Sequence, residues 1–247
     1  MKDMIVIPDI HGRDFWKEAV NGHEDEEIIF LGDYVDPYCY FEDVNPWDGL
    51  KSLREVIDFK KQHPGNVTLL LGNHDLSYVS DYLAKCRHDY DNDEVIHHLI
   101  LDNLPLFSIA HQKLIAGRRY IFTHAGIIPY WLLSDELLSE TVTAGHEVET
   151  LNNLFRSGRL YPSLGCISAT RGGDQLFGSC VWADVSEHLV CESFPDLSLG
   201  AEVYQVFGHT LQTSGKPIIT PHFACLDCRK AFTIDPEGQI TEFPLPH

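Results

Sequence analysis

Five short apolar runs, each ending in a polar turn that contains glycine, constrain the fold of this chain more than any other feature. The runs are rich in Ile, Val, Leu and Phe, as buried β-strands are. They cover residues 4–8, 27–31, 67–71, 120–122 and 203–207. The runs therefore predict five buried strands whose ends carry polar side chains.

Helical patterns lie between several of these runs. The candidates are residues 14–20, 47–62 and 93–103, and the clearest apolar periodicity is in 47–62. Strands that alternate with helices are typical of α/β folds. No internal repeat, low-complexity segment or linker divides the sequence, and 247 residues is an ordinary size for one α/β domain. We therefore expect a single domain over residues 1–247.

The net charge of −19 argues against two classes of binding partner. Nonspecific binding to nucleic acid or to an acidic membrane needs clustered Lys and Arg, but the chain has 18 of these against 37 Asp and Glu. No apolar run reaches the roughly 18 to 20 residues that span a bilayer. Residues 1–4 lead straight into the first strand without a signal-peptide pattern, so a cytoplasmic location is expected. The sequence leaves the oligomeric state open.

Seven cysteines, an odd number spread over the chain, indicate reduced thiols rather than a disulfide framework. Cys225 and Cys228 form a Cys-x-x-Cys pair, which suits half of a zinc site or a redox motif. No second such pair occurs in the sequence, and the flanking residues 223–224 and 231–234 have the pattern of buried strands. Buried thiols are the preferred interpretation, since free cysteine is among the most buried residue types.

The turns after the five strands carry the side chains that bind catalytic divalent metals, which are carboxylates, imidazoles and amides. They read Asp9-x-His11-Gly12, Gly32-Asp33-x-x-Asp36, Gly72-Asn73-His74-Asp75, His124-Ala125-Gly126 and Gly208-His209. The carboxyl ends of strands are where α/β sheets place ligand sites. Two ions about 3.5 to 4 Å apart can bind both the attacking and the leaving oxygen of a displacement. The turns therefore predict a site for two metal ions, and their glycines allow close approach of the backbone.

Each turn alone is weak evidence, because a lone buried histidine is more often a hydrogen-bonded core residue than a ligand. We keep that interpretation, or a surface position, for ten of the fourteen histidines, among them His97, His98 and His111. Two irregular stretches are also candidates for the site. Residues 37–46 follow the second strand and are predicted to form a loop over the site, and residues 157–178 are the longest candidate active-site loop.

The ordered set of turns resembles the signature of the calcineurin-like metallophosphoesterase superfamily. That signature is Asp-x-His, Gly-Asp-x-x-Asp, Gly-Asn-His followed by an acid, a later His beside Gly, and a final Gly-His, and the match runs from residue 9 to about residue 210. Gly32-Asp33-Tyr34-Val35-Asp36 is most similar to the phosphoprotein-phosphatase-like branch, which has bacterial and phage members. The resemblance implies an α/β fold of the metallophosphoesterase type, a four-layer α/β/β/α sandwich.

Carried over residue by residue, the resemblance implies two metal sites and a general acid. His74 stands beside the leaving group as the general acid, and Asp36 orients it and keeps it protonated. The nucleophile is a hydroxide held by the metals, because coordination lowers the pKa of water towards about 7. Mn²⁺ is the expected metal, with Fe or Zn as alternatives. The implied ligands are Asp9 and His11 at the first ion, Asp33 at both ions, and Asn73, His124 and His209 at the second.

Two departures from the family pattern bear on the substrate. The segment Gly208-His209-Thr210-Leu211 lacks the second His that many phosphodiesterases of the superfamily carry, which favours monoester hydrolysis. Pro37 stands where phosphoprotein phosphatases usually place a phosphate-binding arginine. Arg171, in a glycine-rich loop, is predicted to bind the substrate phosphate together with Asn73, and Arg13 is the alternative to Arg171.

We therefore expect a phosphatase, dependent on two metal ions, that hydrolyses phosphomonoesters on a phosphoprotein or a small phosphorylated molecule. The alternative is a nucleotide hydrolase of the dinucleoside tetraphosphatase type, because that activity occurs on closely similar sequences. A non-catalytic scaffold that kept the fold is disfavoured, since all six metal ligands and His74 are present.

Overall fold

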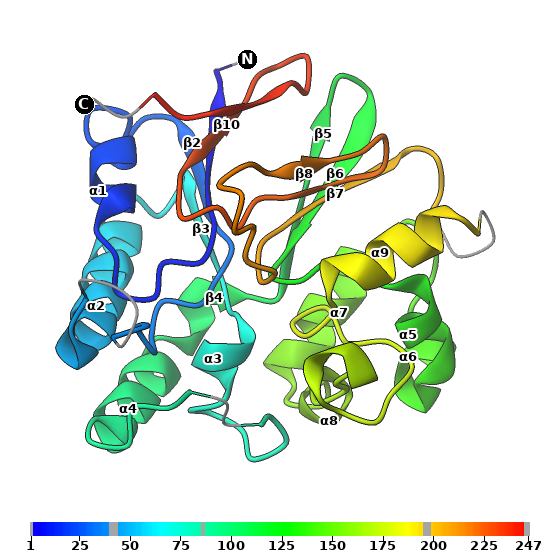
Figure 1. The fold of residues 1–247 in the computed structure, drawn as a ribbon, viewed down its shortest axis with the longest axis horizontal. Coiled ribbons are helices and arrows are strands. Elements are labelled where there is room, and N and C mark those ends of the chain that lie inside the picture. The colour runs from blue at the N-terminus through cyan, green and yellow to red at the C-terminus, as the bar shows by residue number, and fades with distance from the viewer. Residues whose placement is uncertain (1, 40–43, 85–86, 195–198, 245–247) are drawn as a thin grey trace.

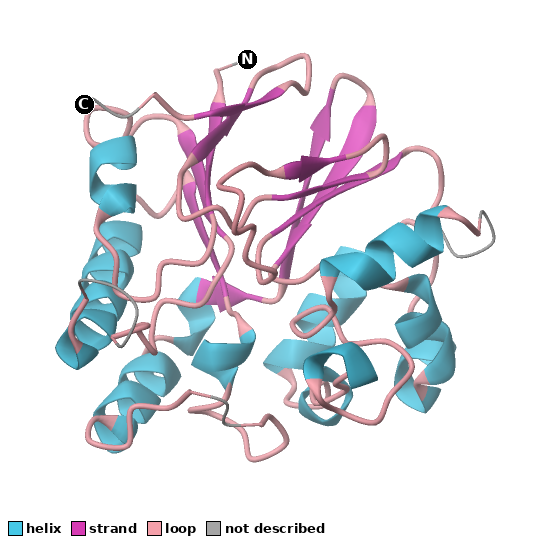
Figure 2. Ribbon diagram, viewed as in Figure 1, coloured by secondary structure: helices cyan, strands magenta, loops and turns pink. Residues whose placement is uncertain are grey.

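The structure, a computed structural model, describes residues 2–39, 44–84, 87–194 and 199–244. Two β-sheets lie face to face in the middle of the molecule, with one group of helices outside each sheet (Figure 1). Figure 2 shows the same layers as magenta strands between cyan helices. The chain is thus a four-layer α/β/β/α sandwich, which confirms the predicted fold class.

The first sheet has the strand order β11-β10-β1-β2-β3-β4 within the described residues. Its strands are β1 (Met4–Ile7), β2 (Glu27–Phe30), β3 (Val67–Leu70), β4 (Phe107–Ser108), β10 (Phe232–Ile234) and β11 (Ile240–Glu242). β1 pairs in parallel with β2, with Met4 opposite Glu27, and antiparallel with β10, with Met4 opposite Ile234. β3 continues in parallel next to β2. The carboxyl ends of β1, β2 and β3 therefore meet at one edge of the sheet.

The second sheet has the order β5-β6-β7-β9-β8. Its strands are β5 (Ala110–Ile115), β6 (Arg118–Thr123), β7 (Val203–Phe207), β8 (Ile218–Ile219) and β9 (Phe223–Cys225). β5 and β6 form an antiparallel hairpin, while β6, β7 and β9 run parallel to one another. The carboxyl ends of these three parallel strands also share one edge.

The helices divide between the two outer faces (Figure 1). On the side of the first sheet lie α1 (Phe15–Val20), α2 (Pro46–Gln62) and α4 (Asp93–Asp102), and the short α3 (Asn73–Leu76) directly follows β3. On the side of the second sheet lie α5 (Pro129–Ser134), α6 (Glu136–Thr141), α7 (Glu147–Arg156), α8 (Tyr161–Leu164) and α9 (Val185–Glu192). The 3₁₀ turns η1 and η2 cover Leu104–Leu106 and Ala169–Arg171. α2 begins where a capping box predicts it, because Asn45 N donates to Asp48 Oδ2 (2.7 Å) and Pro46 takes the first helical position.

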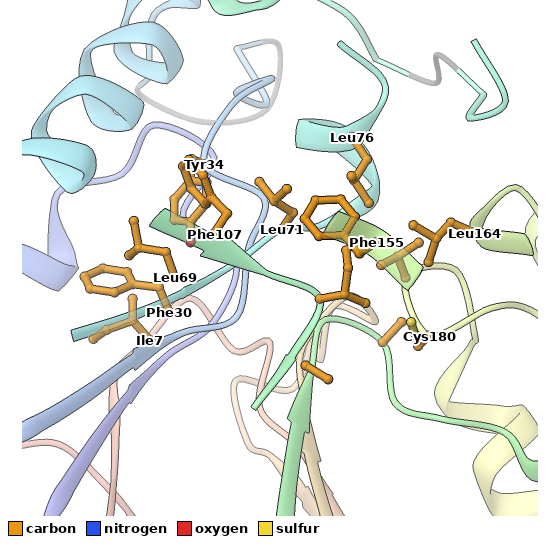
Figure 3. Close-up of a cluster of buried hydrophobic side chains, with 14 of the residues drawn as sticks. Ile7, Phe30, Tyr34, Leu69, Leu71, Leu76, Phe107, Phe155, Leu164 and Cys180 are labelled. Carbon is orange, nitrogen blue, oxygen red and sulfur yellow. The ribbon is translucent and has the colours of Figure 1, made fainter. Parts of the chain in front are cut away.

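The alternation of side chains along the strands creates two apolar interfaces. Met4 and Val6 of β1 pack between the sheets against a cluster that includes Phe122 and Val206. Their neighbours Ile5 and Ile7 point the other way, into the cluster shared with the helices. Figure 3 shows part of this second cluster, with Ile7, Phe30, Leu69, Tyr34 and Phe107 together on one side of the strands. Each buried side chain of this size contributes about 1.5 to 3 kcal/mol, so the interfaces hold the strand ends in fixed positions.

All five predicted strands are confirmed, and so are the three predicted helices, each with bounds shifted by one residue at an end. The apolar segments around the Cys-x-x-Cys pair are β9 and β10, as expected. Residues 157–178 are less irregular than predicted, since they contain α8 and η2. Residues 40–43 of the predicted loop 37–46 lie outside the described residues, and Pro46 already belongs to α2.

The cysteines are free thiols at the six described positions, and both Cys225 and Cys228 are buried. This agrees with the prediction of buried thiols for that pair; Cys86 lies outside the described residues. Among the helices of the described ranges, none is both long and apolar enough to cross a bilayer.

Candidate metal centre

The polar turns after β1, β2, β3, β6 and β7 converge between the carboxyl ends of the two sheets. Direct contact between the sheets is made where the backbone N of His209, after β7, donates to both carboxylate oxygens of Asp9, after β1 (3.0 and 3.2 Å). Five of the six predicted metal ligands are almost completely buried, namely Asp9, His11, Asp33, Asn73 and His124. Polar side chains that are buried close together need hydrogen-bond partners or metal ions, because bulk water does not reach them.

Unusual backbone conformations gather at the same place. Within the described residues, six non-glycine residues have positive φ angles, and four of them are predicted site residues: His11 (44°), Asp33 (54°), Asp36 (57°) and His209 (62°). Positive φ is disfavoured for residues with a Cβ and concentrates at functional sites. The surrounding hydrogen bonds hold these conformations, since His11 N donates to the Asp33 carbonyl (2.8 Å).

Asp33 stands at the centre of the site. Its Oδ2 atom lies 3.4 Å from His11 Nε2 and 3.5 Å from His124 Nε2. Its Oδ1 atom accepts a hydrogen bond from the backbone N of His74 (3.0 Å). A carboxylate that lies close to two imidazoles from different strands is suited to bridge two cations.

Two groups of possible metal ligands share Asp33, as far as the described residues go. One consists of His11, Asp33 and His74, and the other of Asp33, His124 and His209; within each group the ligand atoms lie within 4.8 Å of one another. Asn73 extends the second group, because its Oδ1 lies 3.0 Å from His124 Nε2. The structure therefore brings together five of the six predicted ligands in two adjacent groups.

Asp9 is the predicted ligand that the structure places differently. It is absent from the group of His11 and Asp33, where His74 is found instead. Its carboxylate is engaged by the backbone N of His209. Asp9 is nevertheless a close neighbour, since its charge contributes to the raised pKa of Asp33.

The hydrogen-bond roles of the imidazoles fit bound cations. His124 Nδ1 lies 3.0 Å from the Leu31 carbonyl and His11 Nδ1 lies 2.7 Å from the Val35 carbonyl. A carbonyl oxygen can only accept, so each Nδ1 carries the proton and the Nε2 of a neutral ring has a free lone pair. The two Nε2 atoms lie 3.4 and 3.5 Å from Asp33 Oδ2, and His124 Nε2 also lies 3.0 Å from Asn73 Oδ1; both oxygens are acceptors. Acceptors that face acceptors at this separation are repulsive unless positive charge lies between them.

The electrostatics of the site lead to the same conclusion. Burial lowers the pKa of His11 well below its ordinary value, with further lowering by the neighbouring His74 and Arg87, so this ring is neutral. Burial also raises the pKa of Asp33 well above its ordinary value; His74 opposes this shift, and Asp9 and Asp75 add to it. Carboxylates crowded in a buried site need compensating positive charge, and burial lowers the pKa of His11 and His209 so that these two rings do not supply it.

His74 and Asp36 form a buried pair beside this centre. His74 Nδ1 lies 2.7 Å from Asp36 Oδ2, and the Tyr78 hydroxyl donates to Asp36 Oδ1. Burial, followed by the charge of Asp36, raises the pKa of Tyr78 well above its ordinary value, so the phenol stays a donor. Since both Asp36 oxygens are occupied, the carboxylate fixes the ring of His74 and leaves Nε2 for other partners.

Asp75 joins two of the turns, a role that its place in the Gly-Asn-His-Asp motif did not reveal. Its Oδ2 accepts from the backbone N of Asp33 (2.7 Å) and of Gly72 (2.9 Å), and its Oδ1 accepts from Tyr34 N (2.9 Å). Burial raises its pKa to about 6, although these backbone donors favour the charged form. Asp75 thus holds the turn after β2 against the turn after β3.

Two of the glycines are required by close approach. A Cβ at Gly72 would lie 2.1 Å from Asp33 Oδ1, and a Cβ at Gly208 would lie 2.1 Å from Asp9 Oδ1. Both distances are far below ordinary contact. The expectation that glycine lets the backbone approach the ligands is confirmed at these positions.

Arg171 lies at the His209 side of the site, where it is held by neighbours. Its Nη2 donates to Thr210 Oγ1 (2.6 Å), and its Nε lies 2.9 Å from Asp184 Oδ2. Its charge is one cause of the lowered pKa of His209, after burial. Arg13 lies beside the first metal motif, where Nη1 donates to the Ile10 carbonyl (3.0 Å).

Two further residues in the site were not found by sequence reasoning. Arg87 Nη2 lies 3.3 Å from His11 Nδ1, and Arg87 Nε donates to the Asp36 carbonyl (2.7 Å). Asp227 is buried just past β9, and its pKa is raised by burial and by Asp9. Its place after a parallel strand was a usable signal, which the Cys-x-x-Cys pattern around it obscured. Arg87 sits in an irregular segment between α3 and α4 and had no such signal.

Comparison with known proteins identifies the family. The sequence model described as "Calcineurin-like phosphoesterase" matches residues 4–212, a range that contains all the predicted metal ligands. The chain therefore belongs to the calcineurin-like phosphoesterase family. Its members are hydrolases of phosphate esters and related bonds, and this agrees with the resemblance seen in the turns.

Two curated relatives represent different activities within the family. The chain is 32% identical over 131 residues to the symmetrical bis(5'-nucleosyl)-tetraphosphatase of Chromobacterium violaceum, covering 50% of this chain and 44% of that protein. It is 27% identical over 154 residues to the serine/threonine-protein phosphatase PP1-1 of Saccharomyces cerevisiae, covering 58% of this chain and 45% of that protein. The chain thus spans less than half the length of either relative.

Solved structures share the fold at low sequence identity. A mutant of a cold-active protein tyrosine phosphatase superposes with a TM-score of 0.55 at 14% identity, covering 99% of this chain and 81% of that one. A serine/threonine phosphatase from Saccharomyces cerevisiae with similarity to human phosphatase PP5 gives 0.53 at 15% identity, covering 100% and 81%. These likenesses support the four-layer fold.

Proposed function

We propose that this chain is a phosphatase that uses two divalent metal ions to hydrolyse phosphomonoesters, on a phosphoprotein or a small phosphorylated molecule. The observation that carries the proposal is that His11 Nε2 and His124 Nε2 lie 3.4 and 3.5 Å from the same oxygen of Asp33, while the Nδ1 atom of each ring faces a backbone carbonyl. Asp33 and these two imidazoles would hold divalent cations, whose positive charge would stabilise the buried carboxylate. The buried His74–Asp36 pair beside them supplies a proton donor.

The residues that would hold the metals divide into two sets that share Asp33. Asp9 and His11 belong to the first ion, and Asn73, His124 and His209 belong to the second. Mn²⁺ is our first choice, because the set of carboxylate, amide and imidazole ligands suits it, and the same ligands also accept Fe or Zn. Bound ions of this kind polarise a phosphoryl group and activate water.

The residues of the chain itself account for the remaining steps. His74 donates a proton from Nε2 to the leaving oxygen, and Asp36 stabilises the charged ring by its hydrogen bond to Nδ1 (2.7 Å). Asn73 and Arg171 bind the phosphate on the His209 side. Arg171 donates to Thr210 Oγ1 (2.6 Å), next to His209, and its charge acts on the pKa of that proposed ligand, which supports a place for Arg171 near the bound phosphate.

A second candidate is hydrolysis of a nucleoside polyphosphate. It is favoured by the relative from Chromobacterium violaceum, which is the more similar of the two at 32% identity. The same residues would bind the metals, but the attacked phosphorus would carry two bridging oxygens instead of the one found in a monoester. Substrate specificity therefore has to be separated from catalysis in any test.

The test is hydrolysis by protein freed of metal with EDTA and then reconstituted with Mn²⁺. Phenyl phosphate, bis(p-nitrophenyl) phosphate and a dinucleoside tetraphosphate would be compared at equal concentration. We expect no turnover without metal, and fastest turnover of the monoester with metal. Full activity in verified metal-free protein would contradict the proposal that hydrolysis depends on metal. Faster turnover of the dinucleoside tetraphosphate than of phenyl phosphate would favour the second candidate.

A further inference from the structure

His188 of α9 lies directly behind the turn that carries the proposed metal ligand His124. Its ring is buried, and Nε2 lies 2.9 Å from the carbonyl oxygen of Ala125, the residue after His124. Burial lowers the pKa of His188 to about 4, although the Ala125 carbonyl opposes this shift, so the ring is neutral at neutral pH and carries one proton. A carbonyl oxygen can only accept, so that proton is on Nε2 and His188 donates a hydrogen bond to Ala125.

Gly126 shows how closely the turn packs on this ring. Its φ angle is 82°, and a Cβ at this position would lie 2.3 Å from both Cε1 and Nε2 of His188. Glycine is therefore required after Ala125 for the positive φ, and also because the backbone lies against the imidazole. The ring supports the turn by this contact as well as by the hydrogen bond.

Hydrogen bonds hold the peptide groups on either side of Ala125. The His124 carbonyl accepts from Gly208 N (2.8 Å), and Ala125 N donates to the Cys180 carbonyl (2.8 Å). Both of these bonds join backbone atoms, which ordinary side-chain substitutions leave in place. The bond from His188 to the Ala125 carbonyl comes from a side chain, so its contribution can be measured by mutation.

The same helix also supports the second ligand turn of this sheet. The ring of His188 stacks on Phe207, with ring centroids 4.4 Å apart and an angle of 27° between the planes. Phe207 is the last residue of β7 and leads into the turn of His209. Val185 N, at the start of α9, donates to Thr210 Oγ1 (3.1 Å), just after His209. α9 therefore contacts both turns that supply imidazoles to the proposed second ion.

We propose that His188 is a positioning residue for the second metal ion, and that it holds His124 in place through the Ala125 carbonyl. A metal ligand tolerates a displacement of only about 0.2 Å. Without the donor, the buried Ala125 carbonyl would lose its hydrogen bond from His188, and the turn would shift towards another partner. The inference rests on the proposed function, in that it takes His124 and His209 to bind the second ion.

The test needs a pair of variants that differ in the hydrogen-bond donor. In His188→Gln the side-chain amide can reach the Ala125 carbonyl, whereas the methionine of His188→Met is similar in length but has no N–H group. Both variants remove the ring that stacks on Phe207, so both should lower the Tm of the metal-free protein to a similar extent. A residue with a structural role alone would affect Mn²⁺ binding equally in the two variants. His188→Leu replaces His188→Met if the latter does not fold.

Each variant would be titrated with Mn²⁺ by calorimetry in two backgrounds that separate the ions. His11→Ala removes a ligand of the first ion and leaves the second ion, and His124→Ala does the opposite. In the His11→Ala background, we expect His188→Met to weaken Mn²⁺ binding about 10-fold and His188→Gln to keep most of the affinity. In the His124→Ala background, neither variant should change the affinity, because the supported ligand is absent. Equal weakening by His188→Met and His188→Gln, or the same weakening in both backgrounds, would overturn the inference.

His97→Met is the matched control. His97 Nδ1 also lies close to a backbone carbonyl, that of Tyr78 (2.6 Å), but the residue belongs to α4 on the side of the first sheet. Its replacement should leave the Mn²⁺ affinity unchanged in both backgrounds.

These titrations need no turnover, so they separate the inference from the proposed function. If His188→Met weakens binding of the second ion in a protein that hydrolyses no phosphate, the positioning role stands and the proposed function fails. If His188→Met and the parent bind Mn²⁺ equally in an active enzyme, the positioning role is wrong.

Discussion

Gly208→Ala is the substitution that tests the geometry of the metal centre most directly. The new Cβ would lie 2.1 Å from Asp9 Oδ1, while the next atoms, Asp9 Cγ and Pro8 Cβ, are at 3.3 and 3.6 Å. Gly208 does not have a positive φ, so alanine introduces no backbone strain. The added methyl group therefore acts mainly on the carboxylate of Asp9.

The expected magnitude follows from the size of the overlap. Real Cβ contacts are not closer than 3.0 Å, so Asp9 Oδ1 has to retreat from 2.1 Å by about 0.9 Å. Metal–ligand distances tolerate about 0.2 Å. Asp9 is then lost as a ligand to the first ion, and we expect Mn²⁺ affinity at that ion to fall by about 10- to 100-fold, or roughly 1.4 to 2.7 kcal/mol.

Calorimetric titration of metal-free protein with Mn²⁺ measures this effect. The parent should bind two ions, while Gly208→Ala should bind one tightly and one weakly, and the two proteins should have similar Tm values without metal. Gly65→Ala is the control, since a Cβ there meets no atom within 4 Å. Two tight sites in Gly208→Ala would show that Asp9 is not a ligand, and would leave His74 as the partner of His11 and Asp33.

Three further substitutions test the proposed roles. His74→Asn should keep the metal content and lower kcat by about 10²- to 10⁴-fold, with a smaller loss on nitrophenyl phosphate than on an alkyl phosphate; equal losses would exclude it as the general acid. Asp33→Asn should reduce Mn²⁺ content, measured by elemental analysis, more than Asn73→Ala does, because Asp33 faces both groups of ligands; the opposite order would refute the bridge. Arg171→Ala should cost roughly 2 to 4 kcal/mol in kcat/KM on phenyl phosphate, and unchanged inhibition by inorganic phosphate would refute its role.

The central strands and the turns after them could be predicted because the end of each strand has a local sequence pattern. An apolar run followed by Gly and a polar residue is visible without knowledge of the fold, and the turns at Asp33 and His124 were found in this way. The helices outside the second sheet, α5 to α9, were not predicted; α5, α6 and α8 are only four to six residues long, whereas α7 has a clear apolar face at Val148, Leu151 and Phe155 that could have been found. β5 was missed because only its two end residues, Ala110 and Ile115, are buried among six, so it has no apolar run.

Residues that enter the site from irregular segments could not be predicted. Arg87 reaches His11 across 76 positions of sequence, and nothing in its neighbours marks it as different from an exposed arginine. Arg171 was selected for its glycine-rich loop, but the sequence could not reveal that Asp184 and Thr210 hold it. The positive φ angles at His11 and His209 could not be predicted from the sequence either. They result from hydrogen bonds between turns that only the tertiary structure brings together.

The position of β10 has a consequence for how the protein folds. β1 is an inner strand of its sheet, yet one of its two partners, residues 232–234, is made more than two hundred residues later. During synthesis β1 can pair with β2 early, while its other edge stays open until residues 232–234 have emerged from the ribosome. An open, apolar strand edge attracts strands of other chains. The sheet is therefore completed slowly, and the open edge of β1 has to be protected from other chains until β10 pairs with it.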